Sequence, residues 1–325
     1  MDYLSRIKLP IENEFEDFRN MFNEALTHSD GLLSHALTHI RQRTGKQMRP
    51  MITLLFAKNY GEISDVTLRS AVALELLHTA SLTHDDVVDE SNERRGQPSL
   101  NAAYNNKVSV LVGDYILSTC LLNASFTGNH KIIQVLSNLG RTLAAGEILQ
   151  LQNINSTEIS EEAYYQVIEK KTASLFMACA GIGALSVSAS DEDVEAAKNF
   201  GTNLGMIFQI RDDIFDYFDS HEVGKPTGAD MAEGKLTLPV IYALQHSPYE
   251  SMTPLAKKVK TGTINADEIA VLVEFAKEYG GIEYAQNKMN EIAVHVQDYI
   301  DHYVHDAQLK DAFSAYLEYA IQRKL

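Results

Sequence analysis

An apolar helical stripe that ends in three carboxylates constrains this chain more than any other feature. It lies in residues 77–96, LHTASLTHDDVVDESNERRG. Leu77, Ser81 and Asp85 follow one another at four-residue spacing, which places side chains on one face of an α-helix. Asp89 comes one turn later on the same face, about 6 Å from Asp85 in helical rise. The pattern predicts a helix that carries acidic side chains to its end.

Asp85, Asp86 and Asp89 can reach a common volume in front of this helix. Like charges so close repel one another and destabilise the helix unless a cation or a hydrogen-bond donor lies among them. Magnesium suits such a site, because it accepts one or two carboxylates and completes its octahedron with water and phosphate oxygens. A solvated helix face is the ordinary alternative for an isolated acidic run. Basic residues and a second acidic run favour the metal site.

Two basic clusters suit the binding of a phosphate. Arg94 and Arg95 follow the acids directly, and adjacent guanidinium groups can grip a phosphate through paired hydrogen bonds. Lys46 and Arg49 belong to the sequence GKQMRP, in which Pro50 fits the first turn of a new helix. A loop-to-helix junction offers backbone donors to an anion. Taken alone, a GKxxRP sequence is more often an ordinary basic loop.

The acidic spacing occurs a second time, far along the chain. Residues 208–218 read FQIRDDIFDYF, an otherwise apolar helical pattern. Asp212, Asp213 and Asp216 repeat the intervals of the first acidic run. Two such clusters facing each other could hold a set of magnesium ions around one diphosphate.

These motifs resemble those of the trans-isoprenyl diphosphate synthases, the family of farnesyl, geranylgeranyl and long-chain polyprenyl diphosphate synthases. DDVVD with its RRG sequel is similar to the family's first aspartate-rich motif, and QIRDDIFDY to its second. The resemblance extends from GKQMRP at Gly45 to GGIEYA at Gly280. It implies an all-α bundle around a deep central cavity, with the two acid motifs facing each other at its mouth. It also implies a homodimer and three magnesium ions held with bound diphosphate, with manganese as the alternative metal.

The resemblance implies roles for individual residues. The diphosphate of isopentenyl diphosphate is expected at Lys46, Arg49, His78 and Arg95. The allylic substrate, which is farnesyl, geranyl or geranylgeranyl diphosphate, is expected at Lys171 and Thr172. The full metal set is Asp85, Asp86, Asp89, Asp212, Asp213 and Asp216. The residues expected to act in catalysis are Asp85, Asp86, Asp89, Arg94, Lys171, Asp212 and Asp213. The residues expected to bind the substrates are Lys46, Arg49, His78, Arg94, Arg95, Lys171, Thr172, Gln209, Lys225 and Lys235.

A long segment after the second acidic run is rich in residues that break helices. It comprises residues 224–239, GKPTGADMAEGKLTLP, and contains Lys225 and Lys235. A glycine-bearing loop with two lysines beside a metal site is typical of a lid that closes over a diphosphate and excludes water. A plain connector is the alternative. Three further polar residues have no settled role: Asp114, Glu147 and Gln150.

Composition bounds the fold and the partners. The chain has 325 residues, 45% of them hydrophobic, and a net charge of −16. It shows no alternating strand pattern of useful length and no Pro-, Gly- or Ser-rich linker, so we expect one all-α domain over residues 1–325. The negative charge argues against nucleic acid or an anionic membrane surface as a general partner.

Cysteine usage and hydropathy indicate the cellular setting. Cys120 and Cys179 lie in apolar helical contexts, which predicts buried free thiols and a reducing cytoplasm. The N-terminus has no signal-peptide pattern. Residues 172–190 are uncharged, but their Ser, Thr and Gly content favours a buried core helix over a membrane span. We therefore expect a cytoplasmic protein without an integral membrane segment, although its product partitions into membranes.

Product length is expected to depend on the residues beneath the first acidic motif. Ala80 and Ser81 precede Asp85 by five and four residues, and small side chains there leave the cavity open, whereas an aromatic side chain would form a floor. This resembles the long-chain members of the family and predicts an octaprenyl-like all-trans product. The alternatives are a geranylgeranyl or other shorter-chain synthase, a non-catalytic or partner-dependent subunit of a two-component synthase, and a class I terpene cyclase.

Overall fold

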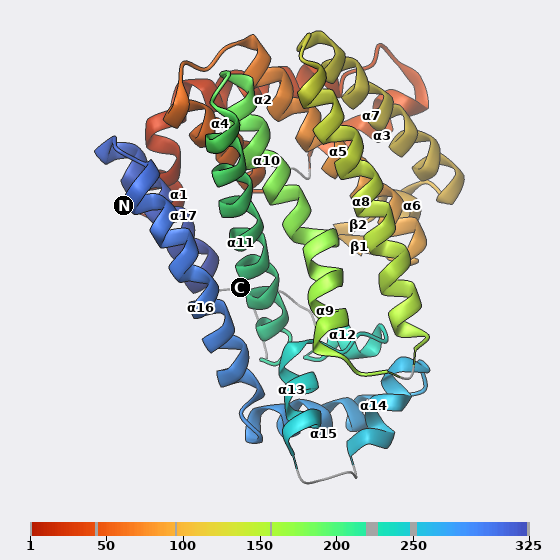
Figure 1. Ribbon diagram of the computed structural model, residues 1–325. Coiled ribbons are helices and arrows are strands. Elements are labelled where there is room, and N and C mark those ends of the chain that lie inside the picture. Colours follow the sequence, from red (N-terminus) through yellow and green to blue (C-terminus); the bar gives the residue numbers. More distant parts are fainter. Residues whose placement is uncertain are drawn as a thin grey trace. The chain divides into compact units, whose positions relative to one another are not determined.

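The computed structural model describes residues 2–42, 45–94, 96–156, 158–218, 227–247 and 252–323. The predicted all-α fold is confirmed: the regular structure of these residues is helical apart from one antiparallel pair of two-residue strands (Figure 1). The chain divides into two compact units. Unit 1 comprises Met1–Gly140, Phe176–Gly201 and Asp301–Tyr316, and unit 2 comprises Arg141–Leu175, Thr202–Ile300 and Leu317–Leu325. The expectation of one domain over residues 1–325 stays a prediction.

The elements are assigned to the units as follows. Unit 1 contains α1 (Tyr3–Lys8), the 3₁₀-helix η1 (Leu9–Ile11), α2 (Glu12–Ala25), α3 (Gly31–Arg41), α4 (Met48–Tyr60), α5 (Asp65–Val88), β1 (Glu93–Arg94), β2 (Gln97–Pro98), α6 (Leu100–Ala103) and α7 (Asn106–Phe126). Unit 2 contains α9 (Glu161–Ile168), the π-helix η2 (Glu169–Ala173), α12 (Ala229–Ala232), α13 (Leu238–His246), α14 (Thr253–Lys260) and α15 (Ala266–Glu278). Every boundary between the units falls inside a helix, namely α8 (His130–Ile154), α10 (Ser174–Ser186), α11 (Asp191–Phe215), α16 (Gly281–Tyr303) or α17 (Ala307–Gln322).

An aromatic row fixes the N-terminal segment to unit 1. Phe15, Phe18 and Phe22 of α2 are buried, and successive rings stack with their centroids 5.8 Å apart. Their three- and four-residue spacing places these side chains on one face of the helix. The 3₁₀-helix η1, where Pro10 lies, separates α2 from α1. Proline has no backbone N–H to continue the α-helical hydrogen bonds, so the chain turns there before α2 begins.

Helix α5 carries the first acidic motif through the interior of unit 1. A capping box formed by Ser64 and Thr67 starts it. Val72, Ala73 and Leu74 are successive residues, which point about 100° apart around the helix axis, and all three are buried. A helix that is apolar on every side is surrounded by other elements, and α5 lies beside α7 (Figure 1). The motif is therefore presented from a rigid, buried element.

The uncharged stretch 172–190 covers the last two residues of η2 and all of α10. Ala178, Cys179 and Ile182 are completely buried, which confirms the core prediction. A Cβ atom at Gly183 would lie 2.5 Å from the carbonyl oxygen of Thr53. The glycine therefore permits the close approach of α10 to α4.

Helix α7 is the one helix among the described residues that is long and apolar enough to cross a membrane by length and composition. Of its most apolar stretch, 39% is buried inside the structure. The helix packs against α5 and exposes Leu111, Leu121, Leu122 and Phe126 on its other side.

Unit 2 has a core of its own around Tyr217, which follows α11. Tyr217 is completely buried, and its hydroxyl oxygen lies 2.9 Å from Oγ1 of Thr237. The N–H of Val240 donates to the same hydroxyl at 3.3 Å. Burial raises the pKa of Tyr217 far above that of a free phenol. Helices α13, α14 and α15 pack together beside this residue (Figure 1), so the end of α11 is held rigidly.

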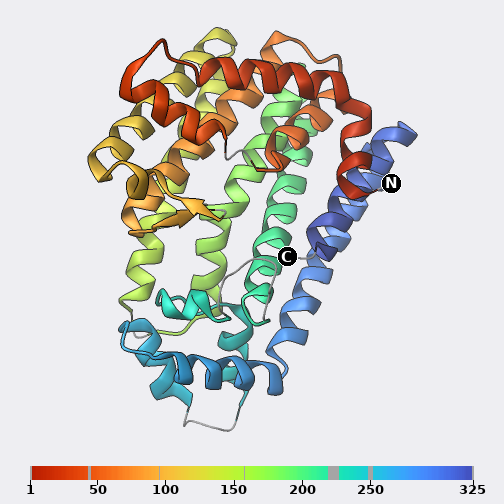
Figure 2. The same ribbon diagram turned by 180° about the vertical axis from the view of Figure 1, so that it is seen from behind.

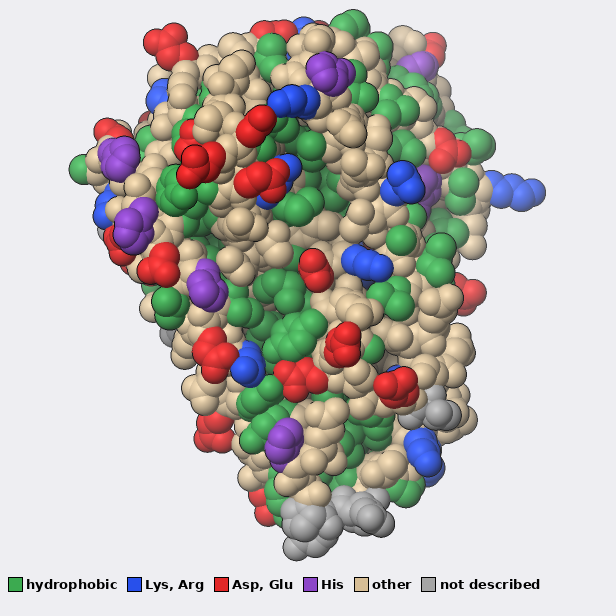
Figure 3. Space-filling model, viewed as in Figure 1, with side chains coloured by type: hydrophobic (Ala, Val, Ile, Leu, Met, Phe, Trp, Pro, Cys, Tyr) green, Lys and Arg blue, Asp and Glu red, His purple; other side chains and the backbone are tan. Residues whose placement is uncertain are grey.

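One face of the molecule carries its acidic side chains in a dispersed form (Figure 3). Among the described residues visible in Figure 3, acidic side chains are spread over the whole face, and lysines and arginines lie singly among them. A protein that binds nucleic acid gathers basic groups into a patch or stripe. The face seen in Figure 3 shows neither a basic patch nor a basic stripe among the described residues.

Candidate active site

The first acidic motif spans the end of α5. Asp85 and Asp86 belong to the helix, which ends at Val88, and Asp89 is its C-cap. The N–H of Asp89 donates to the carbonyl oxygen of Asp85 at 2.8 Å. Asp86 is 4% exposed, whereas Asp85 is half-buried and Asp89 is exposed. The three carboxylates of the motif thus differ strongly in their access to solvent.

Arg94 contacts the motif directly. Its Nε donates to Oδ1 of Asp86 at 2.6 Å, and the two side chains form an ion pair. The antiparallel pair of β1 and β2, drawn as arrows in Figure 2, aligns Arg94 with Gln97 and holds the arginine beside α5. The pairing neutralises the most buried acid of the motif. Arg95, the second predicted arginine, lies outside the described residues.

The GKQMRP segment forms the predicted junction at the start of α4. Gln47 adopts a left-handed backbone conformation (φ 52°) and is the N-cap of the helix, so the chain turns sharply after Lys46. Nη1 of Arg49 lies 2.8 Å from Nε2 of His78. A guanidinium group only donates, so Nε2 of His78 is the acceptor. The structure thus brings together two of the residues predicted to bind isopentenyl diphosphate.

Arg49 also carries a buried polar atom at this corner of unit 1: its Nε has no hydrogen-bond partner among the described residues. A buried donor without a partner is costly and commonly finds one in a ligand or an ordered water. A small cavity of about 70 Å³ lies nearby, and its walls include His78, Asp86 and Arg94.

Ala80 and Ser81 differ although both have small side chains. Ala80 is 2% exposed, which places it in the core of unit 1. Ser81 is half-buried, and its hydroxyl donates to the carbonyl oxygen of His78 at 2.9 Å. Of the two, only Ser81 keeps part of its surface exposed to solvent.

The three acids of the second motif have three different environments within unit 2. Asp212 keeps 44% of its side-chain surface exposed and forms an ion pair with Arg323. Asp213 is buried at 4% exposure. Asp216 accepts hydrogen bonds from the N–H groups of Ala229 (2.9 Å) and Asp230 (3.1 Å). Asp216 therefore binds the first turn of α12.

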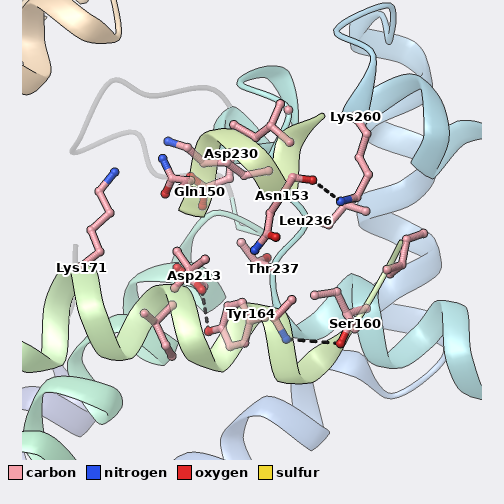
Figure 4. Close-up of a pocket in the computed structure, with 18 of the residues that line it drawn as sticks. Gln150, Asn153, Ser160, Tyr164, Lys171, Asp213, Asp230, Leu236, Thr237 and Lys260 are labelled. Carbon is pink, nitrogen blue, oxygen red and sulfur yellow. Dashed lines mark hydrogen bonds between the residues drawn. The ribbon is translucent and has the colours of Figure 1, made fainter. Parts of the chain in front are cut away.

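Asp213 is the centre of a buried hydrogen-bond chain. The hydroxyl of Tyr164 donates to its Oδ2 at 2.7 Å (Figure 4). Nε2 of Gln209 donates to its Oδ1, also at 2.7 Å. The hydroxyl of Thr172 donates to Oε1 of Gln209 at 2.6 Å. Burial raises the pKa of Asp213 well above its ordinary value of 3.8, and the charge of Asp230 adds to this, whereas the hydrogen bond from Tyr164 opposes it.

A π-helix places Lys171 and Thr172. Single π-helical turns inside longer helices are rare and often occur at functional sites. Nζ of Lys171 lies 2.5 Å from Oε2 of Glu147, and Gln150 donates to the same carboxylate group at 3.2 Å. A Cβ at Gly146 would lie 3.2 Å from the backbone nitrogen of Lys171, so the glycine lets α8 approach η2. Glu147 thus holds Lys171, and Gln150 holds Glu147.

Several of these residues line one cavity of unit 2, and Figure 4 labels Gln150, Tyr164, Lys171 and Asp213 among its walls. The cavity has a volume of about 210 Å³, and its walls also include Thr172, Gln209 and Lys235, together with apolar side chains of α9 and α13. The backbone N–H of Lys235 donates to the carbonyl oxygen of Asp230 at 2.8 Å. Lys225, the other lysine predicted for the lid, lies outside the described residues.

Some features of the site carry no sequence signal. Tyr164 is one of many aromatic residues in an amphipathic helix, and only the fold places its hydroxyl on Asp213. Arg323 lies about a hundred residues beyond Asp212, and no motif contains it. Asp114, whose role the sequence left open, has Oδ1 3.4 Å from Nε2 of His84, which also lies 3.2 Å from the carbonyl oxygen of Val110.

An all-α fold that presents acidic motifs beside lysine and arginine groups defines a class of protein that handles anionic, metal-binding substrates. Comparison with known proteins specifies the class. The Polyprenyl synthetase family model matches residues 30–276. The chain belongs to this family, and it is a prenyltransferase of isoprenoid biosynthesis.

Individual relatives cover most or all of the chain. The octaprenyl diphosphate synthase of Escherichia coli K12 is 35% identical over 83% of this chain and 84% of its own length. The structure of geranylgeranyl pyrophosphate synthase from Bacteroides thetaiotaomicron is 48% identical, covers 99% of each chain and has a TM-score of 0.87. The structure of a polyprenyl synthase from Caulobacter crescentus CB15, complexed with calcium and isoprenyl diphosphate, is 27% identical, covers 99% of this chain and 98% of its own, and has a TM-score of 0.92.

Proposed function

We propose that this prenyltransferase is a magnesium-dependent, long-chain, all-trans polyprenyl diphosphate synthase. It condenses isopentenyl diphosphate head to tail with an allylic diphosphate, and an octaprenyl-like product is preferred. The observation that carries the proposal is the convergence of Lys171, Thr172, Gln209 and Asp213 on one cavity of unit 2. A cation, two hydrogen-bonding groups and a carboxylate are what a metal-bound diphosphate needs from a protein.

The donor chemistry of both acidic motifs fits magnesium. Among the described residues, no group of three or more His, Cys, Asp or Glu side chains is placed so that it could hold a metal ion. Magnesium is commonly bound by one or two carboxylates and by substrate phosphates rather than by an all-protein cage. We assign the metal to Asp85, Asp86 and Asp89 in unit 1 and to Asp212, Asp213 and Asp216 in unit 2. Bound magnesium would neutralise charge on the diphosphate leaving group.

The basic side chains bind and orient the two substrates. Lys171 holds the allylic diphosphate, with Thr172 and Gln209 beside it, and Arg94 adds positive charge at the first motif. Lys46, Arg49, His78 and Arg95 bind isopentenyl diphosphate, and the buried Nε of Arg49 supports this assignment. Lys225 and Lys235 belong to the segment that covers the diphosphate and excludes water, which would otherwise capture the reactive cation.

The reaction needs no side-chain nucleophile. As the allylic C1–O bond breaks, its electron pair leaves with the diphosphate, and the cationic side chains stabilise that charge. The double bond of isopentenyl diphosphate then supplies the electron pair of the new carbon–carbon bond. Loss of a proton to the departed diphosphate forms the new double bond and completes the condensation.

Product length is the finest part of the proposal. The open position at Ser81 supports a long product, and the octaprenyl diphosphate synthase of Escherichia coli is among the relatives. The 48% identical structure is that of a geranylgeranyl pyrophosphate synthase, so a shorter product is the second candidate. A partner-dependent subunit is the third.

The remaining assignments concern assembly and location. We propose a homodimer, and the exposed apolar residues Leu111, Leu121, Leu122 and Phe126 of α7 support it, because an apolar face of this kind commonly packs against another chain. We also propose a cytoplasmic protein that neither binds nucleic acid nor spans the membrane. The acidic charge and the two buried free thiols, Cys120 and Cys179, support this setting.

The test is to incubate the purified chain alone with magnesium, farnesyl diphosphate and labelled isopentenyl diphosphate, and to size the extracted products. A ladder that ends near octaprenyl supports the proposal, and a single geranylgeranyl band supports the second candidate. Absence of product from folded protein refutes a self-sufficient synthase. Asp212→Ala should lose turnover, whereas Glu192→Ala, which removes an exposed acid from the same helix, should not.

A further inference from the structure

Tyr164 ends the hydrogen-bond chain that passes through Asp213 and Gln209 to Thr172. The tyrosine is 7% exposed and the aspartate 4%, so neither side chain has ready access to water. The hydroxyl of Tyr164 donates its one O–H bond to Oδ2 of Asp213 at 2.7 Å.

The donors and acceptors of this hydrogen-bond chain allow only one orientation of the Gln209 amide. Its nitrogen faces Oδ1 of Asp213 and its oxygen faces the hydroxyl of Thr172. A flipped amide would place its oxygen against the carboxylate, where two acceptors meet. Asp213 thereby decides which way Gln209 points. The amide nitrogen carries a second hydrogen, which remains for a ligand in the cavity that Gln209 and Thr172 line.

We propose that Tyr164 is a positioning residue for the allylic diphosphate, an inference that deepens the proposed function and rests on it. Tyr164 holds the carboxylate of Asp213, the carboxylate orients Gln209, and Gln209 orients Thr172 beside Lys171. Loss of the hydroxyl leaves Oδ2 of Asp213 without its buried donor. A buried acceptor without a hydrogen bond lowers the stability of the folded protein. The carboxylate then rotates towards other donors, and the Gln209 amide loses its fixed direction.

A purely structural role makes a different prediction. The ring of Tyr164 forms part of the cavity wall and packs edge-to-face on Tyr165, with the centroids 5.4 Å apart. Phenylalanine preserves that packing. If the ring alone matters, Tyr164→Phe changes neither ligand affinity nor the kinetic constants.

The experiment compares Tyr164→Phe with Tyr165→Phe. Tyr165 is the next residue of the same helix, and its hydroxyl is not part of the hydrogen-bond chain through Asp213. Calorimetry with magnesium and a thiolo analogue of farnesyl diphosphate, which does not ionise, measures allylic binding without turnover. Tyr164→Phe should weaken that binding by about 10- to 100-fold, as the loss of a group that orients a metal-site carboxylate does. KM for isopentenyl diphosphate should change by less than about twofold, because the residues proposed to bind this substrate are not part of the hydrogen-bond chain. Tyr165→Phe should match the wild type.

A double-mutant cycle tests whether Tyr164 acts through Gln209. Once Gln209→Ala has removed the amide, the added Tyr164→Phe substitution should cost little more, because coupled residues are non-additive. Additive losses, or analogue binding by Tyr164→Phe equal to that by Tyr165→Phe, would overturn the inference. A wild-type chain that binds the analogue without elongating farnesyl diphosphate refutes the proposed synthase activity instead, and the binding comparison still decides the role of Tyr164.

Discussion

Asp216 offers the sharpest test of how the second acidic motif divides its work. Its carboxylate accepts the backbone N–H groups of Ala229 and Asp230 in the first turn of α12. Alanine at this position leaves both donors without their acceptor. The loss of a side-chain cap costs roughly 0.5–2 kcal/mol, and hydrogen bonds to a charged group lie at the upper end, so we expect about 2 kcal/mol for local opening of α12.

Amide hydrogen exchange measures this opening at the two donors themselves. A cost of about 2 kcal/mol corresponds to roughly 30-fold faster exchange at Ala229 and Asp230 in Asp216→Ala. Asp216→Asn retains one oxygen acceptor, so its exchange should lie between those of the wild type and the alanine variant. Asp267→Ala is the matched control, because Asp267 also lies in the first turn of a unit 2 helix without accepting a hydrogen bond from it.

Turnover measured on the same variants separates the cap from the metal. If Asp216 serves mainly as a cap, turnover should follow the exchange rates, with Asp216→Asn less affected than Asp216→Ala. If it is mainly a metal ligand, both variants should lose turnover equally, because each removes the negative charge. Exchange at Ala229 and Asp230 that stays at the wild-type rate in Asp216→Ala would refute the capping argument.

Four further outcomes are expected. Ser81→Phe should shorten the product ladder without unfolding the chain, whereas Ala80→Phe overpacks a core position and should cost about 1–3 kcal/mol in thermal unfolding; unchanged products in Ser81→Phe would contradict the floor argument. Asp85→Ala should reduce turnover by orders of magnitude with an unchanged circular dichroism spectrum, and near-normal turnover would remove Asp85 from the metal site. Gly183→Ala places a Cβ 2.5 Å from a backbone oxygen of α4, so it should lower the melting temperature, with a cost of about 1–3 kcal/mol. A hydrogen bond from Arg6 lowers the pKa of Asp311 from its usual 3.8, so Asp311→Asn should be less stable than the wild type at neutral pH. This difference in stability should vanish as the pH falls through the folded-state pKa of Asp311. A difference that persists in acid would exclude the ion pair as its cause.

The sequence determined the helices and the chemical groups of the site. Helical periodicity depends on neighbours three and four residues apart, so the buried face of Phe15, Phe18 and Phe22 could be predicted without a fold. The acidic motifs are equally local, because their residues lie within one or two turns of one another. The lysine and threonine at 171 and 172 carry no such local signal, and resemblance to a family was needed to single them out.

Tertiary structure decided what each of these groups contacts. Nothing in DDVVD indicates that Asp86 is buried against Arg94 while Asp89 is exposed, since this depends on how β1 and β2 fold back on α5. The small residues at 80 and 81 look alike in sequence, yet one faces the core and the other does not. Tyr164 and Asp213 are 49 residues apart, and their hydrogen bond exists only because α9 and α11 pack together. Local patterns fix which residues share a helix face, whereas burial and hydrogen-bond partners depend on contacts between distant segments, which no short-range pattern encodes.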